Sequence, residues 1–389
     1  MHSRSPAVSI RSFVAVLLCT AVCAGEEFYR SLAYPDTLDP QLAITGPSRV
    51  RAGASLDLQV VSLGRDGEPA SMPDLPVLTC EGPCLPNECD GAAAREIPLQ
   101  RVKTGIYRAA TPFTLDEPGY FLFTVRDPDG QVLPSGLPVL ASEKEPALRL
   151  HWADLHGHST LSDGARAPEE YYRWARDVAK LDAIALTDHN WALDDQKIAR
   201  LRELARAWYA PGRFVPFFAF EWAGGPVRSA PARGRPDHKN LIFRRVDEPL
   251  TPWEPDWRHT PSVGELWRLL GGREVIAIPH HTGLPHATFF GTDWSLHDQR
   301  FERLAEVFSD WGSSETPYDR YPLPETEPGN FVRDALCAGR HLGLVGGSDT
   351  HGSRPGLNAL PRAGHPYALT ALTAIEAPTR TRDDLWLAL

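Results

Sequence analysis

Histidine and tryptophan are absent from residues 25–147 of this 389-residue chain. Apart from His2, every histidine lies at or after His151, and all 11 tryptophans lie at or after Trp152. Histidine is the commonest protein ligand of transition metals. We therefore predict that residues 25–147 contribute no metal ligand.

The same front region also lacks long periodic runs. Its apolar residues alternate in short stretches at 55–61, 105–109 and 119–127, which are broken by glycine and proline. Such spacing is typical of the strands of a β-sandwich. We predict a small β-sandwich domain with no evident chemistry over residues 25–147, in which residues 141–146 are the linker to the rest of the chain.

After residue 24 the chain has no apolar run long enough to span a bilayer. Residues 1–24 have arginines at the start, a short apolar core at 13–18 and a small-residue cleavage site, as signal peptides do. We predict an exported protein, periplasmic or secreted, without a membrane span. A lipoprotein anchor at Cys23 is disfavoured, because Val22 is bulky for the position before a lipidated cysteine.

Cysteine is scarce, at six residues, two of them within the signal peptide. Cys80, Cys84 and Cys89 cluster in a loop rich in proline and glycine, and Cys337 stands alone. In an exported chain, a disulfide within the cluster is favoured over a zinc knuckle. The remaining thiol is then either buried or paired with Cys337, and the sequence leaves both open.

An excess of positive charge is also missing, since the formal net charge is -10. That balance excludes a broad nucleic-acid surface, because such surfaces neutralise phosphates with lysine and arginine. It does not exclude a small anionic substrate in a locally positive pocket. We therefore expect a small anionic partner rather than a nucleic-acid polymer.

From residue 148 onward, apolar runs rich in β-branched residues alternate with amphipathic runs. The predicted strands are 148–155, 181–188, 214–221, 239–244, 274–280, 305–309 and 342–348. The predicted helices are 167–179, 193–208, 262–270, 329–340 and 382 to the end. This alternation predicts an α/β fold with a parallel sheet or a βα-barrel, whose chemistry lies at the C-terminal strand ends.

The first of these strands ends in His156 and His158, on either side of Gly157. Residues i and i+2 of an extended chain point to the same side, so the two imidazoles converge. Neutral imidazoles that converge in this way suit a divalent transition metal. Alone, the pair is as consistent with two ordinary surface histidines at a strand end as with a metal site.

Histidine, aspartate or glutamate recurs at the ends of several other predicted strands. The residues concerned are His189, Glu221, His280, His281, Asp349 and His351, with His238 at the start of another strand. Any one of them could be an ordinary polar group of the surface or core. Coincidence at this many strand ends is improbable, so we predict a metal centre there.

These segments resemble a known family. Residues 154–164, 185–189, 279–281 and 348–351 resemble the four motifs of the PHP (polymerase and histidinol phosphatase) family. Within it, the segments that resemble the DUF3604 branch are 220–222, 238–243, 278–283, 306–315 and 347–356. The resemblance covers residues 150–389. It implies a distorted (β/α)7 barrel over residues 148–389, and it implies a site with two or three metals in a family made up mostly of phosphoesterases.

The resemblance also implies a ligand set: His156, His158, Asp163, His189, Glu221, His238, His280, Asp349 and His351. Glu221 would bridge two ions. His156, His158 and Asp349 would complete the first site, His238 and His280 the second, and Asp163, His189 and His351 the third. Mixed histidine and carboxylate ligation suits zinc, manganese or iron without choosing among them.

Two residues next to predicted ligands, His281 and Asp188, are expected to support the ligands rather than to bind metal. His281 directly follows His280 and departs from the commoner family pattern, so we expect it to support a ligand rather than to bind metal. Asp188 precedes His189, and we expect it to orient an imidazole.

The expected activity is that of an exported, metal-dependent hydrolase, a phosphoesterase whose nucleophile is a hydroxide bridging two ions about 3.5–4 Å apart. Glu221 and Asp349 would be the catalytic carboxylates, and Arg354 and Lys239 would contact the substrate. The insert 223–237 is interpreted either as a lid or as a solvated loop. Two alternatives stay open: hydrolysis of a C–N, carboxyl-ester or sulfate-ester bond, and a non-catalytic metal-binding module.

The last predicted helix starts near Thr381 and has no cap before Leu389. Relatives in the DUF3604 branch commonly continue into a further β segment, so we expect this chain to be a truncated product.

Overall fold

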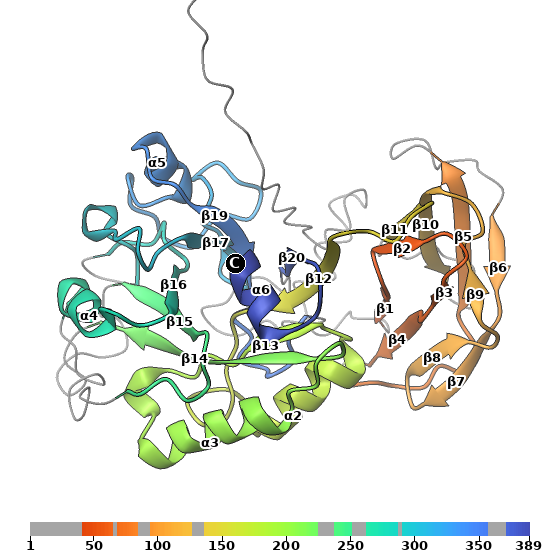
Figure 1. The fold of residues 1–389 in the computed structure, drawn as a ribbon, viewed down its shortest axis with the longest axis horizontal. Helices are drawn as coiled ribbons and strands as arrows, with labels where there is room; N and C mark the ends of the chain where they lie inside the picture. The colour runs from red at the N-terminus through yellow and green to blue at the C-terminus, as the bar shows by residue number, and fades with distance from the viewer. Residues whose placement is uncertain are drawn as a thin grey trace, which may run out of the picture.

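The computed structural model describes residues 41–64, 68–84, 94–126, 136–224, 237–250, 262–286, 290–356 and 371–389 (Figure 1). The predicted signal peptide, Cys89, the side chain of Cys84 and most of the predicted insert 223–237 lie outside these ranges. None of the described helices is long and apolar enough to cross a membrane.

Among described residues, the stretch 41–142 contains strands and no helix. The strands are β1 (Gln41–Thr45), β2 (Arg49–Arg51), β3 (Ser55–Leu56), β4 (Gln59–Leu63), β5 (Val77–Cys84), β6 (Arg95–Ile97), β7 (Leu99–Lys103), β8 (Ile106–Ala109), β9 (Phe113–Thr114), β10 (Gly119–Arg126) and β11 (Leu137–Ser142). They form a sheet in the order β1-β4-β8-β7, a second in the order β2-β11-β10-β5-β6, and a β3-β9 ribbon. The predicted linker 141–146 therefore begins two residues too early, inside β11.

The core of this region follows from alternation along its strands. Phe121, Phe123 and Val125 of β10 are buried, whereas the residues between them are partly exposed. Successive strand residues point to opposite faces of a sheet, so the apolar set packs inward. These side chains join Leu78 of β5 and Val139 of β11 in one apolar cluster.

The described cysteines are unpaired. Cys80 is a buried free thiol and Cys337 an exposed one. Burial raises the pKa of Cys80 to about 11, so the thiol stays protonated. The pairing of Cys80 with Cys337 that the sequence left open is wrong. The predicted disulfide within the cluster does not involve Cys80, and Cys89 and the side chain of Cys84 lie outside the described residues.

Every strand and helix predicted after residue 148 has a counterpart. The strands are β12 (Arg149–Asp154), β13 (Ala183–Ala185), β14 (Val215–Ala223), β15 (His238–Phe243), β16 (Val275–Pro279), β17 (Leu304–Ser309), β18 (Gly312–Ser313), β19 (Gly343–Gly346) and β20 (Thr373–Ala377). The helices are α2 (Pro168–Arg173), which continues as a π-helical turn (Trp174–Val178), α3 (Asp195–Ala207), α4 (Val263–Leu270), α5 (Val332–Cys337) and α6 (Arg382–Ala388). The sequence did not predict β18 and β20.

The sheet of this second region is mixed rather than all parallel. Its order is β16-β15-β14-β13-β12-β20. The pairs β12/β13 and β13/β14 are parallel, whereas β14/β15, β15/β16 and β12/β20 are antiparallel. Because β15 runs backwards, its first residue, His238, lies opposite Ala223 at the end of β14. The start of β15 thus reaches the same sheet edge as the ends of its neighbours.

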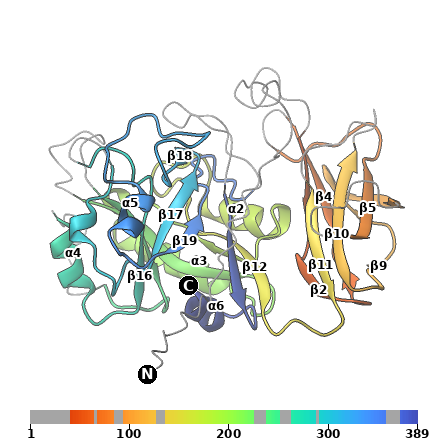
Figure 2. The ribbon, with the colours of Figure 1, turned by 90° about the horizontal axis from the view of Figure 1, so that it is seen from above.

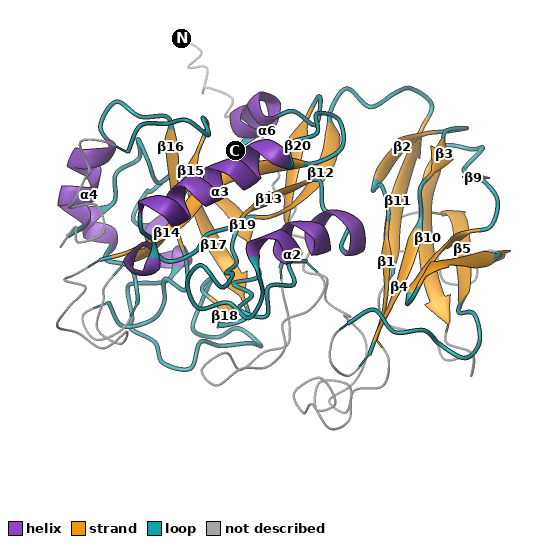
Figure 3. Ribbon diagram, turned by 90° about the horizontal axis from the view of Figure 1, so that it is seen from below, coloured by secondary structure: helices purple, strands orange, loops and turns teal. Residues whose placement is uncertain are grey.

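The two faces of β14 have different neighbours. Phe218, Phe220 and Trp222 pack in one cluster with the apolar residues of α3, and α2 and α3 lie across this face of the sheet (Figure 3). Phe217 and Ala219 point the other way, into a second cluster. Glu221 has the same parity as Phe217 and Ala219, so the strand aims its carboxylate inward.

A smaller sheet in the order β18-β17-β19 lies beside the larger one. Strand β16 neighbours β17, and β19 neighbours β20, so the strands surround the inward-facing cluster. The backbone ladder is nevertheless not continuous between the two sheets. The predicted (β/α)7 barrel therefore stays an interpretation of this arrangement.

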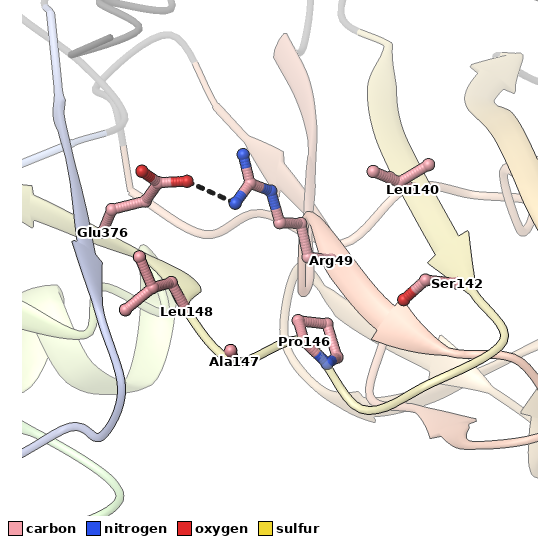
Figure 4. Close-up of a pocket in the computed structure, with 7 residues that line it drawn as sticks. All are labelled: Arg49, Leu140, Ser142, Pro146, Ala147, Leu148 and Glu376. Carbon is pink, nitrogen blue, oxygen red and sulfur yellow. Dashed lines mark hydrogen bonds and ion pairs between the residues drawn. The ribbon is translucent and has the colours of Figure 1, made fainter. Parts of the chain in front are cut away.

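The two regions are in contact, with the front strands standing beside β12 and β20 (Figure 2). Val61 and Leu63 of β4 belong to the same apolar cluster as α3, and Gln59 Nε2 donates to the Val178 carbonyl at 3.0 Å. A cavity of about 330 Å³ lies between the regions, and the ion pair of Arg49 with Glu376 bridges it (Figure 4).

Candidate metal centre

The structure brings every predicted metal ligand to one edge of the sheet. Apart from Asp163, whose side chain is 30% exposed, these side chains are buried. Backbone pairing continues past the strand ends and fixes the loops: Gly157 bridges to Thr350, and His189 bridges to Glu221. The Asp349 amide also donates to the His156 carbonyl at 3.0 Å.

The first group of donors consists of His156, His158, Glu221 and Asp349. The Nε2 atoms of both histidines lie 3.3 Å from Glu221 Oε2. They also lie 3.3 and 3.1 Å from Asp349 Oδ1. Donors about 2.1 Å from one cation in a tetrahedron are about 3.4 Å apart. The observed spacing matches that of one metal coordination shell.

The other oxygen of Glu221 faces a second group. Glu221 Oε1 lies 2.5 Å from His238 Nδ1 and 3.1 Å from His280 Nε2. The ligand atoms of these residues and of His281 lie within 4.8 Å of one another. One carboxylate thus stands between two sets of imidazoles, as a bridging ligand does.

A third group consists of His158, Asp163, His189 and His351, whose ligand atoms also lie within 4.8 Å of one another. Asp163 Oδ2 lies 3.4 Å from His351 Nε2 and 3.7 Å from His189 Nε2. His158 takes part with its second nitrogen, since Nδ1 is 3.8 Å from Asp163 Oδ1. This grouping adds His158 to the three residues that the sequence analysis had put there.

His281 differs from its expected supporting role. It converges with Glu221, His238 and His280, and its buried Nδ1 has no hydrogen-bond partner. Its φ of 35° is one that residues other than glycine rarely adopt. Such strain persists where the surroundings over-determine it, which is common at functional sites. The geometry makes His281 a candidate ligand.

Unpartnered nitrogens test whether this set fits a metal. The buried ring nitrogens without a hydrogen-bond partner include His158 Nδ1, His189 Nδ1, His238 Nε2, His280 Nδ1 and His281 Nδ1. Buried polar atoms normally have partners, since leaving them without one costs about 1–3 kcal/mol. Imidazole and carboxylate donors are those that transition metals take. These buried groups could therefore hold a metal ion.

The histidines of the site differ in the direction in which their pKa values are shifted. Burial lowers the pKa of His189 to about 3 and that of His280 to about 4, so both are neutral near pH 7, as metal ligands must be. Burial alone would also lower the pKa of His158, but hydrogen bonds to Asp349 and Glu221 raise it to about 10. Metal binding at the first group would therefore release protons.

Glu306 contacts a candidate ligand and was not predicted as a site residue from the sequence. Its Oε2 lies 3.0 Å from His156 Nδ1, the ring nitrogen opposite the one that faces Glu221. A carboxylate in this position fixes the orientation of a ligand imidazole. Burial raises the pKa of Glu306 to about 7. A glutamate within the apolar predicted strand 305–309 was the signal that could have revealed it.

Asp154 and Asp188 organise the ligand loops. Asp154 Oδ1 accepts from the amides of His156 and Ser348, one in each loop. Asp188 accepts from the amides and hydroxyls of Ser159 and Ser162. The expectation that Asp188 orients an imidazole is wrong, because its oxygens hold the turn after His158 instead.

Gly347 lies where the packing around His156 is tightest. A Cβ there would be 2.2 Å from Glu306 Oε2 and 2.8 Å from His156 Cβ. We expect Gly347→Ala to displace one of these side chains and to lower the affinity for metal by about 10- to 100-fold. Gly264→Ala is the control, since a Cβ there meets nothing within 4 Å. Equal metal affinity in the two variants, measured by chelator competition, would contradict the role given to this packing.

Lys239 does not have the substrate-facing position that the sequence analysis gave it. It is 1% exposed, and its ammonium lies 2.7 Å from Glu302 Oε1 and 3.1 Å from Asp237 Oδ1. As the residue after His238 on β15, it points to the opposite face of the strand. Its charge is used inside the protein, and we assign it a structural role.

Arg354 is likewise committed elsewhere. It is 3% exposed, and its Nη2 lies 2.6 Å from Glu68 Oε1 of the front region. A guanidinium neutralised by a protein carboxylate is not presented to a substrate phosphate. The predicted phosphate contact is replaced by a contact between the two regions. Arg228, Arg233 and Arg235 of the predicted insert lie outside the described residues.

Comparison with known proteins gives one family match. Residues 175–322 match the model of a family described as a protein of unknown function, DUF3604. An uncharacterized protein of Chlamydia pneumoniae is 23% identical over 273 residues, which is 66% of this chain and 41% of that protein. An uncharacterized protein of Chlamydia muridarum is 23% identical over 242 residues, which is 60% of this chain and 37% of that protein.

The chain thus spans about two fifths of the length of the curated relatives that it matches. The match supports the DUF3604 part of the resemblance. It covers Glu221, His238 and His280, so the chain resembles DUF3604 proteins in the segment that supplies the second group of donors.

Proposed function

We propose that this chain is an exported, metal-dependent hydrolase that acts on phosphate esters, built as a PHP-type barrel. The observation that carries the proposal is the position of Glu221. Its two oxygens face separate sets of imidazoles, at 3.3 Å on one side and 2.5 to 3.1 Å on the other. A bridging carboxylate of this kind is the mark of sites that hold two ions side by side.

The three groups of donors would hold two or three divalent ions, with zinc, manganese and iron all compatible with nitrogen and oxygen ligands. When bound, such ions acidify a water molecule into a nucleophile and neutralise charge that develops on phosphoryl oxygens. The protein's own contribution is to hold the donors in place. Glu306 fixes His156, and Asp154 and Asp188 fix the loops that carry the other ligands.

The serines of the ligand loops support hydrolysis without a protein nucleophile. The Ser159 and Ser162 hydroxyls donate to Asp188 at 2.7 and 2.6 Å. The Ser348 and Ser353 hydroxyls donate to the carbonyls of His156 and His158, both at 2.8 Å. A nucleophilic serine is typically activated by an adjacent imidazole or amine base. None of these hydroxyls faces a basic nitrogen.

Aromatic rings border the imidazoles. Trp191 stacks on His189 at 5.1 Å between ring centroids, and Phe290 lies 4.5 Å from His238. Trp311 lies 5.6 Å from His281. Apolar walls around charged groups lower the local dielectric and strengthen electrostatic interactions there. Such walls would strengthen the interaction between the bound ions and an anionic substrate.

A substrate panel tests the proposal. We expect purified protein to hydrolyse a phosphomonoester or phosphodiester, to lose this activity with a chelator, and to regain it with added zinc or manganese. Asp349→Asn is the matched variant, because it replaces one charged donor oxygen of the first group. Turnover of only an amide, carboxyl ester or sulfate ester would overturn the phosphate assignment. No turnover in a protein that binds metal tightly would show a non-catalytic module.

A further inference from the structure

The front region reaches the metal centre through one carboxylate. Glu68 lies shortly after β4, and its Oε1 pairs with Arg354 at 2.6 Å and also with Arg166. The Arg354 side chain is only 4% exposed. The sequence analysis gave this region no chemistry, so the contact needs a reason of its own.

The two arginines belong to the two loops that supply most donors of the first and third groups. Arg166 follows the loop that carries His158 and Asp163. Arg354 follows the loop that carries Asp349 and His351. Glu68 therefore touches both loops at once, from a separate part of the chain.

The same two loops are tied to each other directly. The Ala165 amide donates to the His351 carbonyl at 2.7 Å, and the Ser353 hydroxyl donates to the His158 carbonyl at 2.8 Å. The rings of His158 and His351 stack at 4.2 Å between centroids. A displacement of either arginine would therefore be transmitted to ligand side chains of the third group.

The burial of Arg354 makes Glu68 necessary. Its Nε and Nη1 have no hydrogen-bond partner, and the guanidinium lies over the Trp174 ring at 5.6 Å. A buried charge that loses its partner is strongly destabilising, so the side chain would move to reach water. Its loop, with Asp349 and His351, would move with it.

We propose that Glu68 is a positioning residue of the metal centre, which holds Arg166 and Arg354 and through them sets the geometry of the third donor group. The front region then supplies no ligand but controls how tightly the ligands hold metal. This inference rests only on the metal-binding part of the proposed function and is independent of which bond is hydrolysed.

The test compares metal affinity in matched variants by competition with a chromophoric chelator for zinc. We expect Glu68→Gln to lower the affinity for the most weakly bound zinc ion by about tenfold, as substitutions of residues that support metal ligands do. The control is Glu376→Gln, which breaks a different ion pair between the regions, that of Arg49 with Glu376 (Figure 4). Its side chain is 37% exposed, against 38% for Glu68, so the control removes a carboxylate of similar exposure whose partner, Arg49, lies away from the ligand loops.

A double-mutant cycle separates positioning from general destabilisation. If Glu68 acts through Arg354, the affinity loss in Glu68→Gln/Arg354→Gln should be clearly smaller than the product of the two single losses. The thermal midpoint of metal-free Glu68→Gln should fall below that of Glu376→Gln, because only Glu68 neutralises a buried guanidinium, so zinc affinity is compared at a temperature where both variants are folded. Unchanged zinc affinity in Glu68→Gln, or an equal loss in Glu376→Gln, would overturn the proposal. Because zinc binding is the readout, the result stands whether or not phosphate esters are hydrolysed.

Discussion

Glu221→Gln is expected to remove metal from more than one donor group and to lower the rate of hydrolysis by at least ~100-fold. This loss exceeds the effect expected for a residue that only supports a metal ligand. The carboxylate oxygens face His156 and His158 on one side and His238 and His280 on the other. An amide keeps the shape of the carboxylate but has one acceptor oxygen and no charge. One set of imidazoles would then face an NH2 group instead of an oxygen, and the negative charge would be lost for both sets. Both neighbouring cations would then be held more weakly.

The matched variant is His351→Gln, which changes a member of the third group only. We expect it to lose at most the metal of that group and to keep measurable turnover. Metal analysis and a phosphatase assay on both purified proteins make the comparison, with circular dichroism to show that the fold persists. Full metal content with near-normal turnover in Glu221→Gln would refute the bridging role.

Lys239→Met is expected to lower the free energy of unfolding by about 3–5 kcal/mol, because it removes the ammonium that neutralises two buried carboxylates. Asp237 and Glu302 are 3% and 1% exposed. The lysine lies within 3.1 Å of both. The loss would also loosen the start of β15, where His238 is the neighbouring residue.

Denaturant unfolding of the metal-free protein measures this effect without interference from bound ions. Arg244→Met is the control, since Arg244 pairs with Glu274 and Asp383 in a more exposed position and should matter far less. If Lys239→Met unfolded at the same denaturant concentration as the unmodified protein and instead raised KM, Lys239 would be a substrate contact after all.

Most elements of the second region, though not β18 and β20, could be predicted from sequence because they depend on local patterns. The strand Arg149–Asp154, which precedes His156, and the helix Asp195–Ala207 follow from apolar patterns that lie within the segments themselves. Strand direction does not follow in the same way. Nothing local to β15 indicates that it runs antiparallel, yet that reversal is what brings His238 to the ligand edge.

The supporting residues of the centre were harder to predict than its ligands. Histidines at strand ends stand out in the sequence, whereas Glu306, Asp154 and Glu68 look like ordinary acidic residues. Their roles depend on contacts with residues far along the chain, such as the ion pair of Glu68 with Arg354. Arg354 was assigned to the substrate for the same reason, since its position in the sequence gives no sign of a partner in the front region.

Anomalous diffraction from crystals of the unmodified protein and of Glu221→Gln tests the central claim most directly, because it locates metal rather than counting it. We expect peaks on both sides of Glu221 in the unmodified protein, each about 2.0–2.3 Å from a carboxylate oxygen and from ring nitrogens. In Glu221→Gln these peaks should be weakened or lost. An unmodified protein soaked in zinc or manganese with no peak between Glu221 and the surrounding histidines would contradict the assignment of this cluster as a metal centre.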